Sequence, residues 1–395
     1  MDLKEKFKTD FFMTLFEKRE IPDIYQKIAY ADNGKTLYEA DAEVKHGQEK
    51  HQLYIVALIP EYLNTFLKKE NQYIQKTYYQ NNLGYAIRMK DVINIDSYLK
   101  SQFKSNHKIV KRSLTRLESC FNINYKTFFG RISKEEYNFL MSTLKEFLVR
   151  RFAQRNDEHK KLREWNIILD NTFDQINRKE ASLFIIYDDK KPIDISLNYH
   201  MDKIVFSAIS SYDIDYYKFG VGHVEMIKLV EWCLLDQFEF LELGYGDLEF
   251  KRRWCNHIYQ FKYQVIYNKN VLFTPIIATF HVYKLTLKEY LKAKKVNVLI
   301  KRVKDSISIS RLKETNNRND LIYEKTPITN MESLGDVEKV DLENVTYRFL
   351  KGVLYDFLYA TVEHKSNTSI FKITQNPNSY LIKGKNSMQQ ILIKN

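Results

Sequence analysis

The stretch Ser182–Trp254 reads SLFIIYDDKKPIDISLNYHMDKIVFSAISSYDIDYYKFGVGHVEMIKLVEWCLLDQFEFLELGYGDLEFKRRW, and its pattern predicts the fold. Apolar positions alternate up to a turn at Asp188–Lys190 and alternate again beyond it. A glycine-bearing loop, a helical stripe and a short apolar strand that ends in glycines follow. This order predicts a β-β-β-loop-α-β unit.

The loop of this unit, Tyr216–His223 (YYKFGVGH), lies between the third strand and the helix. A strand that leads through a glycine loop into a helix presents unpaired backbone N–H groups with a partial positive charge. The loop therefore suits a phosphate group.

Composition describes a globular chain. The 395 residues are enough for two or three domains, and 44% of them are hydrophobic. With only 11 Gly and 6 Pro against 28 Tyr and 25 Phe, a disordered or collagen-like chain is excluded. The net charge of +12 favours an anionic partner such as a nucleotide, nucleic acid, phosphorylated carrier or membrane face. A solvated lysine-rich surface explains it equally well.

The cysteines and the N-terminus indicate the setting. Cys120, Cys233 and Cys255 show no paired spacing, which disfavours a disulfide framework and a zinc site, so no metal is expected. The first twenty residues mix charge throughout, unlike a signal peptide, and no run approaches eighteen apolar residues. We therefore expect a cytoplasmic protein.

The N-terminal residues 1–95 are predicted to form a small α/β lobe that packs against or grips a substrate. Asn33-Gly34 marks a hairpin, and Pro60 precedes a helix expected over 61–79. The expected strands are Lys27–Asp32, Lys35–Val44, His51–Ile59 and Gly84–Met89.

A basic helix is expected over 96–120, capped by Asp96 or Ser97. One face carries the cations Lys100, Lys104, Lys108, Lys111, Arg112 and Arg116. This face suits nucleic acid, a nucleotide phosphate or lipid head groups, or is simply solvated. Further helices are expected over 133–154, with a Ser133–Glu136 capping box, and over 159–175.

Beyond Trp254, a hairpin over 259–273 with its turn at Asn268–Asn270 and a basic helix over 285–305 are expected. A polar, turn-rich linker over 313–340 follows. The last segment, 341–395, is predicted as a small α+β appendage for docking or oligomerisation. It has a helix over 341–352 and strands over 354–364, 368–374 and 379–384.

Two motifs in order carry a family resemblance. Tyr212-Asp213 precedes the loop Lys218–Gly222, and an acidic-x-Gly-x-Gly-acidic stretch runs over Glu242–Lys251. Over about 96–282 the chain resembles the CelD-like acetyltransferases, a family of the GNAT superfamily that is similar to the FemAB aminoacyltransferases. The chain departs from the family pattern at Val221, where proline is usual, and at Glu242, where aspartate is usual. Phe250 replaces a tyrosine and lacks its hydroxyl.

The resemblance implies an α/β (α+β) fold of GNAT type. We expect two tandem GNAT-like lobes, a degenerate one over 1–95 and the acyltransferase domain over 96–312, followed by the linker and the C-terminal appendage. The donor, acyl-CoA, would lie between the strands expected at Ile204–Ser210 and Phe238–Gly244.

The resemblance also implies site residues. The pyrophosphate of the donor would contact the loop residues Lys218, Phe219, Gly220, Val221, Gly222 and His223. Substrate contacts would come from Tyr212, Asp213, Gly246 and Phe250. Either Glu242 or Asp247 would act as general base, and Lys251 would neutralise an oxyanion or an acceptor phosphate. Structural alternatives remain open: the glycines as a tight connection, His223 as a packing residue, and Asp247 and Glu249 as helix caps.

We therefore expect an N-acyltransferase that moves an acyl group from acyl-CoA, or from an acyl carrier protein, to an amine. The acceptor would be a cell-envelope or exopolysaccharide precursor, an amino sugar or an amino acid. One alternative is FemAB-like transfer from aminoacyl-tRNA, for which the basic helix is suitable. Another is a non-catalytic binding platform on the same fold.

Overall fold

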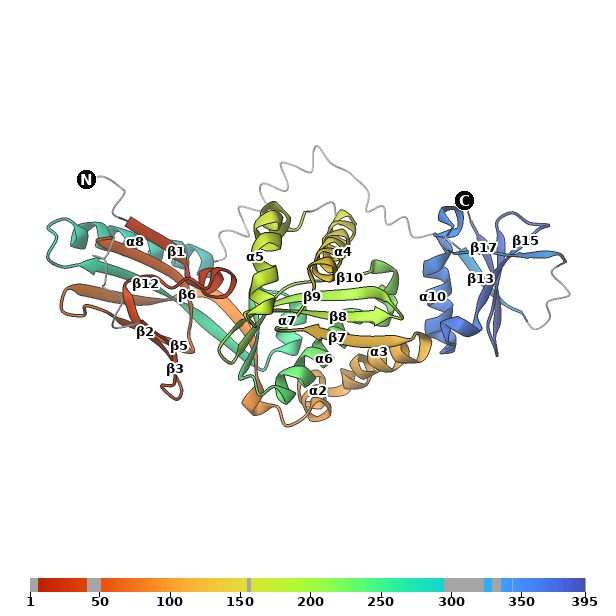
Figure 1. Ribbon diagram of the computed structural model, residues 1–395, viewed down its shortest axis with the longest axis horizontal. Helices are drawn as coiled ribbons and strands as arrows, with labels where there is room; N and C mark the ends of the chain where they lie inside the picture. Colours follow the sequence, from red (N-terminus) through yellow and green to blue (C-terminus); the bar gives the residue numbers. More distant parts are fainter. Residues whose placement is uncertain are drawn as a thin grey trace. The chain divides into compact units, whose positions relative to one another are not determined.

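A computed structural model describes residues 6–40, 51–154, 158–294, 323–328, 335–342 and 344–394 (Figure 1). The chain divides into two compact units. Unit 1 comprises Met1–Asp91, Tyr199–Ser207 and Gln237–Thr315. Unit 2 comprises Val92–Asn198, Ala208–Asp236 and Asn316–Asn395.

The main sheet of unit 1 has the strand order β1-β4-β12-β6-β11, with the first residues of β10 beside β11. Strand β12 is central, since it pairs antiparallel with both β4 and β6. The bounds are β1 (Lys6–Asp10), β4 (Leu53–Pro60), β6 (Tyr73–Arg88), β10 (Ile204–Tyr212), β11 (Phe240–Tyr245) and β12 (His257–Asn268).

A three-stranded sheet of order β3-β2-β5 completes the strands of unit 1: β2 (Tyr25–Tyr30), β3 (Thr36–Glu39) and β5 (Leu63–Leu67). The hairpin expected at Asn33-Gly34 is confirmed, because Gly34 has a φ of 70° between the antiparallel β2 and β3. The helical segments are α1 (Phe11–Met13), η2 (Thr14–Lys18), η3 (Met89–Asp91), α7 (Glu249–Trp254) and α8 (Thr274–Ala293).

The helix expected over 61–79 is wrong, since β5 and the start of β6 occupy these residues. Leu63 and Leu67 are both buried, and a four-residue spacing fits one turn of a helix as well as two repeats of a strand. The hairpin expected over 259–273 is also wrong. Its turn at Asn268–Asn270 is present, but Thr274 donates a hydrogen bond to the Asn268 carbonyl (2.5 Å) and the chain enters α8 instead of a second strand.

Unit 2 holds the later part of β10 and the strands β9, β8 and β7, in that order. Figure 1 shows α4 and α5 on one side of these strands and α3 and α6 on the other. The expected order from Ser182 onward is confirmed. The bounds are β7 (Ile123–Phe128), β8 (Ala181–Asp188), β9 (Lys191–Met201), α3 (His107–Cys120), α4 (Lys134–Ala153), η5 (Lys160–Glu164), α5 (Trp165–Asn177), η6 (Ile214–Phe219) and α6 (Val221–Leu235).

Strand β9 is buried on both faces, and one face is polar. Asp194, Ser196 and Asn198 alternate with isoleucine and leucine, and all three polar side chains are fully buried. Glu225 of α6 is also buried and accepts a hydrogen bond from the Ser210 hydroxyl (2.6 Å). Neither carboxyl oxygen of Asp194 has a hydrogen-bond partner among the described residues. Burial, and then the nearby charge of Glu225, raise the pKa of Asp194 well above its usual range.

The basic helix expected over 96–120 is instead two helices, α2 (Ile95–Phe103) and α3, joined by the short η4 (Lys104–Asn106). Lys104 has a φ of 49°, so the helix cannot continue through it. The cap is Asn94, which accepts from the Ser97 N–H (2.9 Å), and not Asp96 or Ser97. The Ser133 cap of α4 is confirmed, with the Glu136 N–H donating to its hydroxyl (3.2 Å).

The C-terminal part of unit 2 has a five-stranded sheet of order β13-β17-β16-β15-β14 and one longer helix, α10 (Leu350–Thr361). The strand expected over 354–364 is wrong, because Leu354, Phe357 and Leu358 are buried at helical spacing within α10. The strands and remaining helical turns are β13 (Tyr323–Pro327), β14 (Val337–Lys339), β15 (Ser369–Ile373), β16 (Ser379–Lys383), β17 (Met388–Ile393), η8 (Val345–Tyr347) and η9 (Lys365–Asn367).

Most of the linker expected over 313–340 lies outside the described residues, although β13 and β14 fall within it. The end of the helix expected over 285–305 also lies outside them. In the described part of the chain, no helix is long and apolar enough to cross a membrane. The architecture is mixed α/β, and a tandem pair of GNAT-like lobes is not confirmed.

Candidate active site

The loop between β10 and α6 is one candidate site, and it lies in unit 2. Gly220 has a φ of 63° and ends η6 at the residue before α6. A Cβ atom there would lie 2.6 Å from the Ser113 hydroxyl of α3, so both backbone conformation and space favour glycine. The hydrogen bonds of α6 begin with His223 and Val224, which donate to the Gly220 carbonyl (2.8 and 3.3 Å). The preceding N–H groups of Val221 and Gly222 belong to the first turn, whose donors have no partner within a helix.

The start of this loop is fixed by ion pairs on Asp213, which is 1% exposed. Its carboxylate contacts Lys191 (2.6 Å) and Arg150 (3.1 Å) and accepts from the Asp215 N–H (3.2 Å). Burial alone would raise the pKa of Asp213, but these partners hold it below its usual value. The ring of Tyr212 lies beneath the Arg151 guanidinium at 4.8 Å. Asp213 thus anchors the loop.

The side chains of the loop point in different directions. Phe219 and Val221 are fully buried, and the His223 ring contacts that of Phe103 edge-on at 6.0 Å. Beside Gly222 there is open space, with nothing within 4 Å of the position of a Cβ atom. Lys218 forms an ion pair with Asp356 of α10 (3.0 Å). The C-terminal segment therefore supplies the counter-charge of the loop lysine.

Glu242 of β11 is the centre of a separate candidate site, in unit 1. Its carboxyl group is fully buried and accepts three hydrogen bonds, from the hydroxyls of Tyr62 (3.0 Å) and Tyr259 (2.9 Å) and from the Gly244 N–H (2.8 Å). Burial raises the pKa of Glu242 to about 7, and these hydrogen bonds limit the rise. A carboxyl group with such a pKa can exchange a proton near neutral pH.

The two tyrosines are held in place by close packing. The Tyr62 ring stacks on Phe240 (4.6 Å) and meets Tyr259 edge-on (5.1 Å). A Cβ atom on Gly84 would lie 2.2 Å from the Tyr259 ring, so this strand position requires glycine. Sequence reasoning missed both tyrosines. Tyr62 and Glu242 are 180 positions apart, and nothing in either local pattern links them.

The remaining predicted site residues of unit 1 follow β11. Lys251 donates to the Tyr245 carbonyl (2.8 Å), and burial lowers the pKa of its ammonium group. Asp247 is exposed, forms an ion pair with Arg252 and accepts from the Tyr85 hydroxyl (2.9 Å). The hydrogen bond from Arg252 lowers the pKa of Asp247, which makes it a weak base at neutral pH.

The motif after β11 ends at the surface. Gly246 has a φ of 100° and is exposed, and the Phe250 ring is 40% exposed and lies 6.4 Å from that of Trp254. Asp247 does not cap α7, because no side chain caps that helix. Glu249 instead pairs with Arg253 one turn later.

Cys120, Cys233 and Cys255 are all buried and free. Burial raises the pKa of the Cys233 and Cys255 thiols, which disfavours a thiolate nucleophile. Among the described residues, no group of three or more His, Cys, Asp or Glu side chains is placed to hold a metal ion.

Residues 105–252 match the family model described as "Acetyltransferase (GNAT) domain". The chain carries a GNAT acetyltransferase domain. Its matched residues begin at α3 and end with the motif after β11, so they include the loop before α6 and Glu242. The GNAT domain makes the protein an acyltransferase, as the resemblance implied. A search of curated proteins gave no match.

Among solved structures, the chain is similar to a conserved protein of unknown function from Bacteroides thetaiotaomicron, with a TM-score of 0.39, 10% identity, and coverage of 56% of this chain and 71% of that one. It is also similar to the C-terminal domain of a putative lysylphosphatidylglycerol synthetase from Agrobacterium fabrum. The TM-score is 0.36 and the identity 9%, and the match covers 55% of this chain and 68% of that one. A third similar structure is FemX, with a TM-score of 0.31, 10% identity, and coverage of 58% of this chain and 74% of that one. These values say nothing about the substrate of the GNAT domain.

Proposed function

We propose that the protein is an N-acyltransferase that moves an acyl group from acyl-CoA to an amine of an envelope or exopolysaccharide precursor, an amino sugar or an amino acid. The observation that carries this proposal is the loop before α6 within the GNAT domain. Gly220 turns the chain so that the N–H groups of Val221 and Gly222 head α6. Such a helix N-terminus binds the pyrophosphate of a nucleotide donor.

Within unit 1, the end of the β10–β11 ladder offers a backbone that suits the extended arm of an acyl-CoA. The parallel ladder holds three residue pairs, from Ile204 with Phe240 to Phe206 with Glu242. Gly244 then has a φ of 70° and donates its N–H to the carboxyl group of Glu242. Beyond Glu242, the described residues leave β11 without a ladder partner on this side, and its backbone can bind the extended arm of a donor.

Glu242 is the general base in this proposal, and not Asp247. Acyl transfer requires that the acceptor ammonium lose a proton, after which its nitrogen attacks the thioester carbonyl and the CoA thiolate leaves. Glu242 is fully buried, so the proton would pass through the hydroxyl of Tyr62 or Tyr259. That hydroxyl takes the acceptor proton as it gives its own to Glu242. The leaving thiolate takes up a proton at the end of the reaction.

A titration of the purified protein with acetyl-CoA, longer acyl-CoAs and free CoA, followed by calorimetry and by thermal shift, tests the proposal. A ligand that binds only the native state raises the melting temperature, by an amount that grows with ligand concentration. We expect saturable binding. If no CoA compound binds, the acyl-CoA donor is wrong, and an acyl carrier protein or aminoacyl-tRNA must be tried instead.

The two partners of the Lys218–Asp356 ion pair should have opposite effects on CoA binding. Lys218→Ala removes a charge from the phosphate loop, and we expect CoA affinity to fall about three- to tenfold. Asp356→Asn frees Lys218 for the ligand, so affinity should stay the same or rise. Both variants lose this ion pair, but Asp356→Asn also removes the ion pair with Lys325 (3.3 Å), so Lys325→Ala is the stability control for that variant. Equal losses of affinity in the two variants would contradict a role for Lys218 in binding.

Gly222→Ala should separate stability from binding. A Cβ atom at this position meets nothing within 4 Å, and alanine is favoured over glycine in a helix. We expect the free energy of unfolding to rise by about 0.5–1 kcal/mol. CoA affinity, measured by calorimetry, should fall because the added methyl group stands beside the N–H group of Gly222. Unchanged affinity would show that the donor does not approach the helix here.

A further inference from the structure

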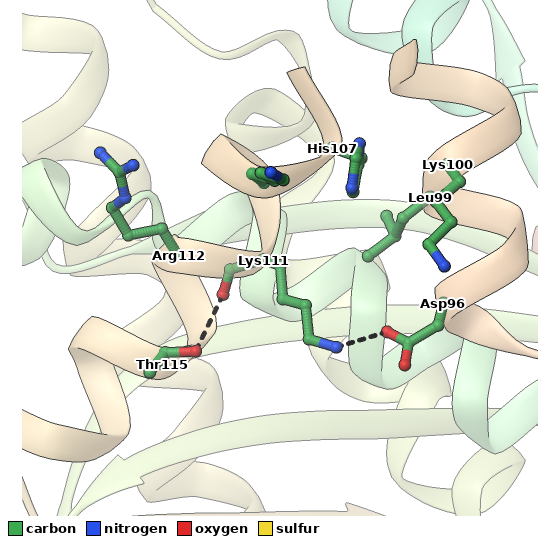
Figure 2. Close-up of a pocket in the computed structure, with 8 residues that line it drawn as sticks. Asp96, Leu99, Lys100, His107, Lys111, Arg112 and Thr115 are labelled. Carbon is green, nitrogen blue, oxygen red and sulfur yellow. Dashed lines mark hydrogen bonds and ion pairs between the residues drawn. The ribbon is translucent and has the colours of Figure 1, made fainter. Parts of the chain in front are cut away.

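A cavity lies between α2 and α3 in unit 2. It has a volume of about 350 Å³ and is lined by Asp96, Leu99, Lys100, His107, Lys108, Lys111, Arg112 and Thr115. Figure 2 shows Lys111 reaching from α3 to Asp96 on α2. The break at η4 creates the pocket, because it folds α3 back beside α2 instead of continuing a single helix.

The pocket has an excess of positive charge. Asp96 is the one acidic residue that lines the pocket, and the Asp96 carboxylate forms an ion pair with Lys111 (2.7 Å). For Lys100, Lys108 and Arg112, the described residues supply no ion-pair partner within 4.0 Å. Three cations without an ion-pair partner among the described residues attract an anion, and the planar Arg112 guanidinium can bind a phosphate with two parallel hydrogen bonds.

The ring of His107 adds a directed polar group. Its Nδ1 lies 2.5 Å from the Lys104 carbonyl. Because a carbonyl oxygen only accepts, Nδ1 donates this hydrogen bond, and Nε2 of the neutral ring can accept one from a hydroxyl group of the ligand.

This pocket is on a different face of α3 from the loop before α6. Lys108, Lys111, Arg112 and Thr115 have the spacing i, i+3, i+4 and i+7, so they share one helix face. Ser113, which lies against Gly220, is on another face, together with the buried Val110 and Leu117. The body of α3 therefore separates the pocket from the phosphate loop.

We propose that the α2–α3 pocket binds the phosphate group of a small molecule. The volume is at the lower end of the range for small-molecule sites and suits a sugar phosphate or mononucleotide. The buried Leu99 gives the pocket an apolar floor, unlike a flat basic surface for a macromolecule. The phosphate belongs either to a phosphorylated acceptor or to the nucleotide end of CoA, and both sources present the same chemistry.

The test is calorimetric titration of the full chain with inorganic pyrophosphate and with UDP, each with and without saturating CoA. We expect saturable binding that weakens as salt rises. Binding that persists with CoA present assigns the pocket to an acceptor phosphate. Binding that CoA displaces, together with weaker CoA binding by the pocket variant, assigns it to the nucleotide end of the donor.

The pocket variant is Lys108→Ala/Arg112→Ala, and its control is Lys145→Ala/Lys190→Ala, which removes two exposed cations elsewhere in unit 2. We expect at least about a tenfold loss of pyrophosphate affinity in the first and less than twofold in the second. Circular dichroism checks that both fold. Equal losses of pyrophosphate affinity in the two variants would overturn the proposal. So would a wild-type protein that binds neither pyrophosphate nor UDP, or one that binds only tRNA or an acidic protein. Because pyrophosphate carries no acyl group, this result is independent of whether acyl-CoA is the donor.

Discussion

Replacement of Glu242 by glutamine is expected to lower kcat/KM for acyl transfer about 10²- to 10³-fold. Glutamine keeps the shape of the side chain and its oxygen can still accept from a tyrosine, but it cannot take up a proton. The wild-type rate should rise with pH through about 7, because burial raises the pKa of Glu242 to about 7 and only the ionised form is a base. In the variant this rise should disappear. A pH profile of kcat/KM with saturating acyl-CoA measures both effects.

Asp247→Asn is the matched control, since it also neutralises a carboxylate of the same motif. Asp247 is exposed and its pKa is lowered by Arg252, so its loss should reduce kcat/KM less than about fivefold. A large effect at Asp247 and a small one at Glu242 would reverse the assignment of the base. If Glu242→Gln keeps the pH dependence of the wild type, Glu242 is not the titrating group.

Asp194→Asn is expected to raise the free energy of unfolding at pH 7.5. Burial and the charge of Glu225 raise the pKa of Asp194 in the folded state. Below the pKa of the unfolded chain both states hold the proton, and no stability is lost. As pH rises above that value, only the unfolded state releases its proton, so the wild type loses stability. The asparagine variant avoids this loss.

Denaturant unfolding from pH 4 to pH 8 measures the difference. The stabilisation by Asp194→Asn should be near zero at pH 4 and grow with pH. Asp189→Asn, an exposed carboxylate at the turn between β8 and β9, should change stability by less than about 0.5 kcal/mol with no such trend. Destabilisation by Asp194→Asn at every pH would mean that Asp194 is ionised and paired in the native protein.

The sequence was sufficient to predict the order of strands and helix over Ser182–Trp254, because the local signals agreed there. Alternation over β8 and β9, the turn at Asp189 and the glycine before α6 all favour one fold. The prediction of secondary structure failed where the spacing of apolar residues fitted both the helical and the strand period. Leu63 and Leu67 fitted a helix as well as a strand, and residues 354–364 are aromatic enough for a strand but pack as α10.

The candidate site residues also divide into those that a local motif indicates and those that only the fold brings together. Gly220, the loop before α6 and Glu242 were proposed from motifs that are contiguous in the chain. Tyr62 could not be found in this way, because its hydrogen bond to Glu242 joins residues 180 positions apart. Tyr259 is 17 positions from Glu242, but it lies in β12, and no local pattern links it to β11. The partner of Lys218 was equally hidden, since Asp356 lies in the C-terminal segment outside the resemblance.

The central position of β12 has a consequence for biosynthesis. Strands β4 and β6 both pair with β12, and Asn268 at its end bonds to Gln52, 216 residues earlier. Translation proceeds at about 5–20 residues per second, so roughly 10 to 40 s pass between the synthesis of β4 and that of its partner β12. During this time the edges of β4 and β6 are open to other chains. The nascent protein should therefore depend on chaperones until β12 emerges, and a fragment of residues 1–95 should aggregate when expressed alone.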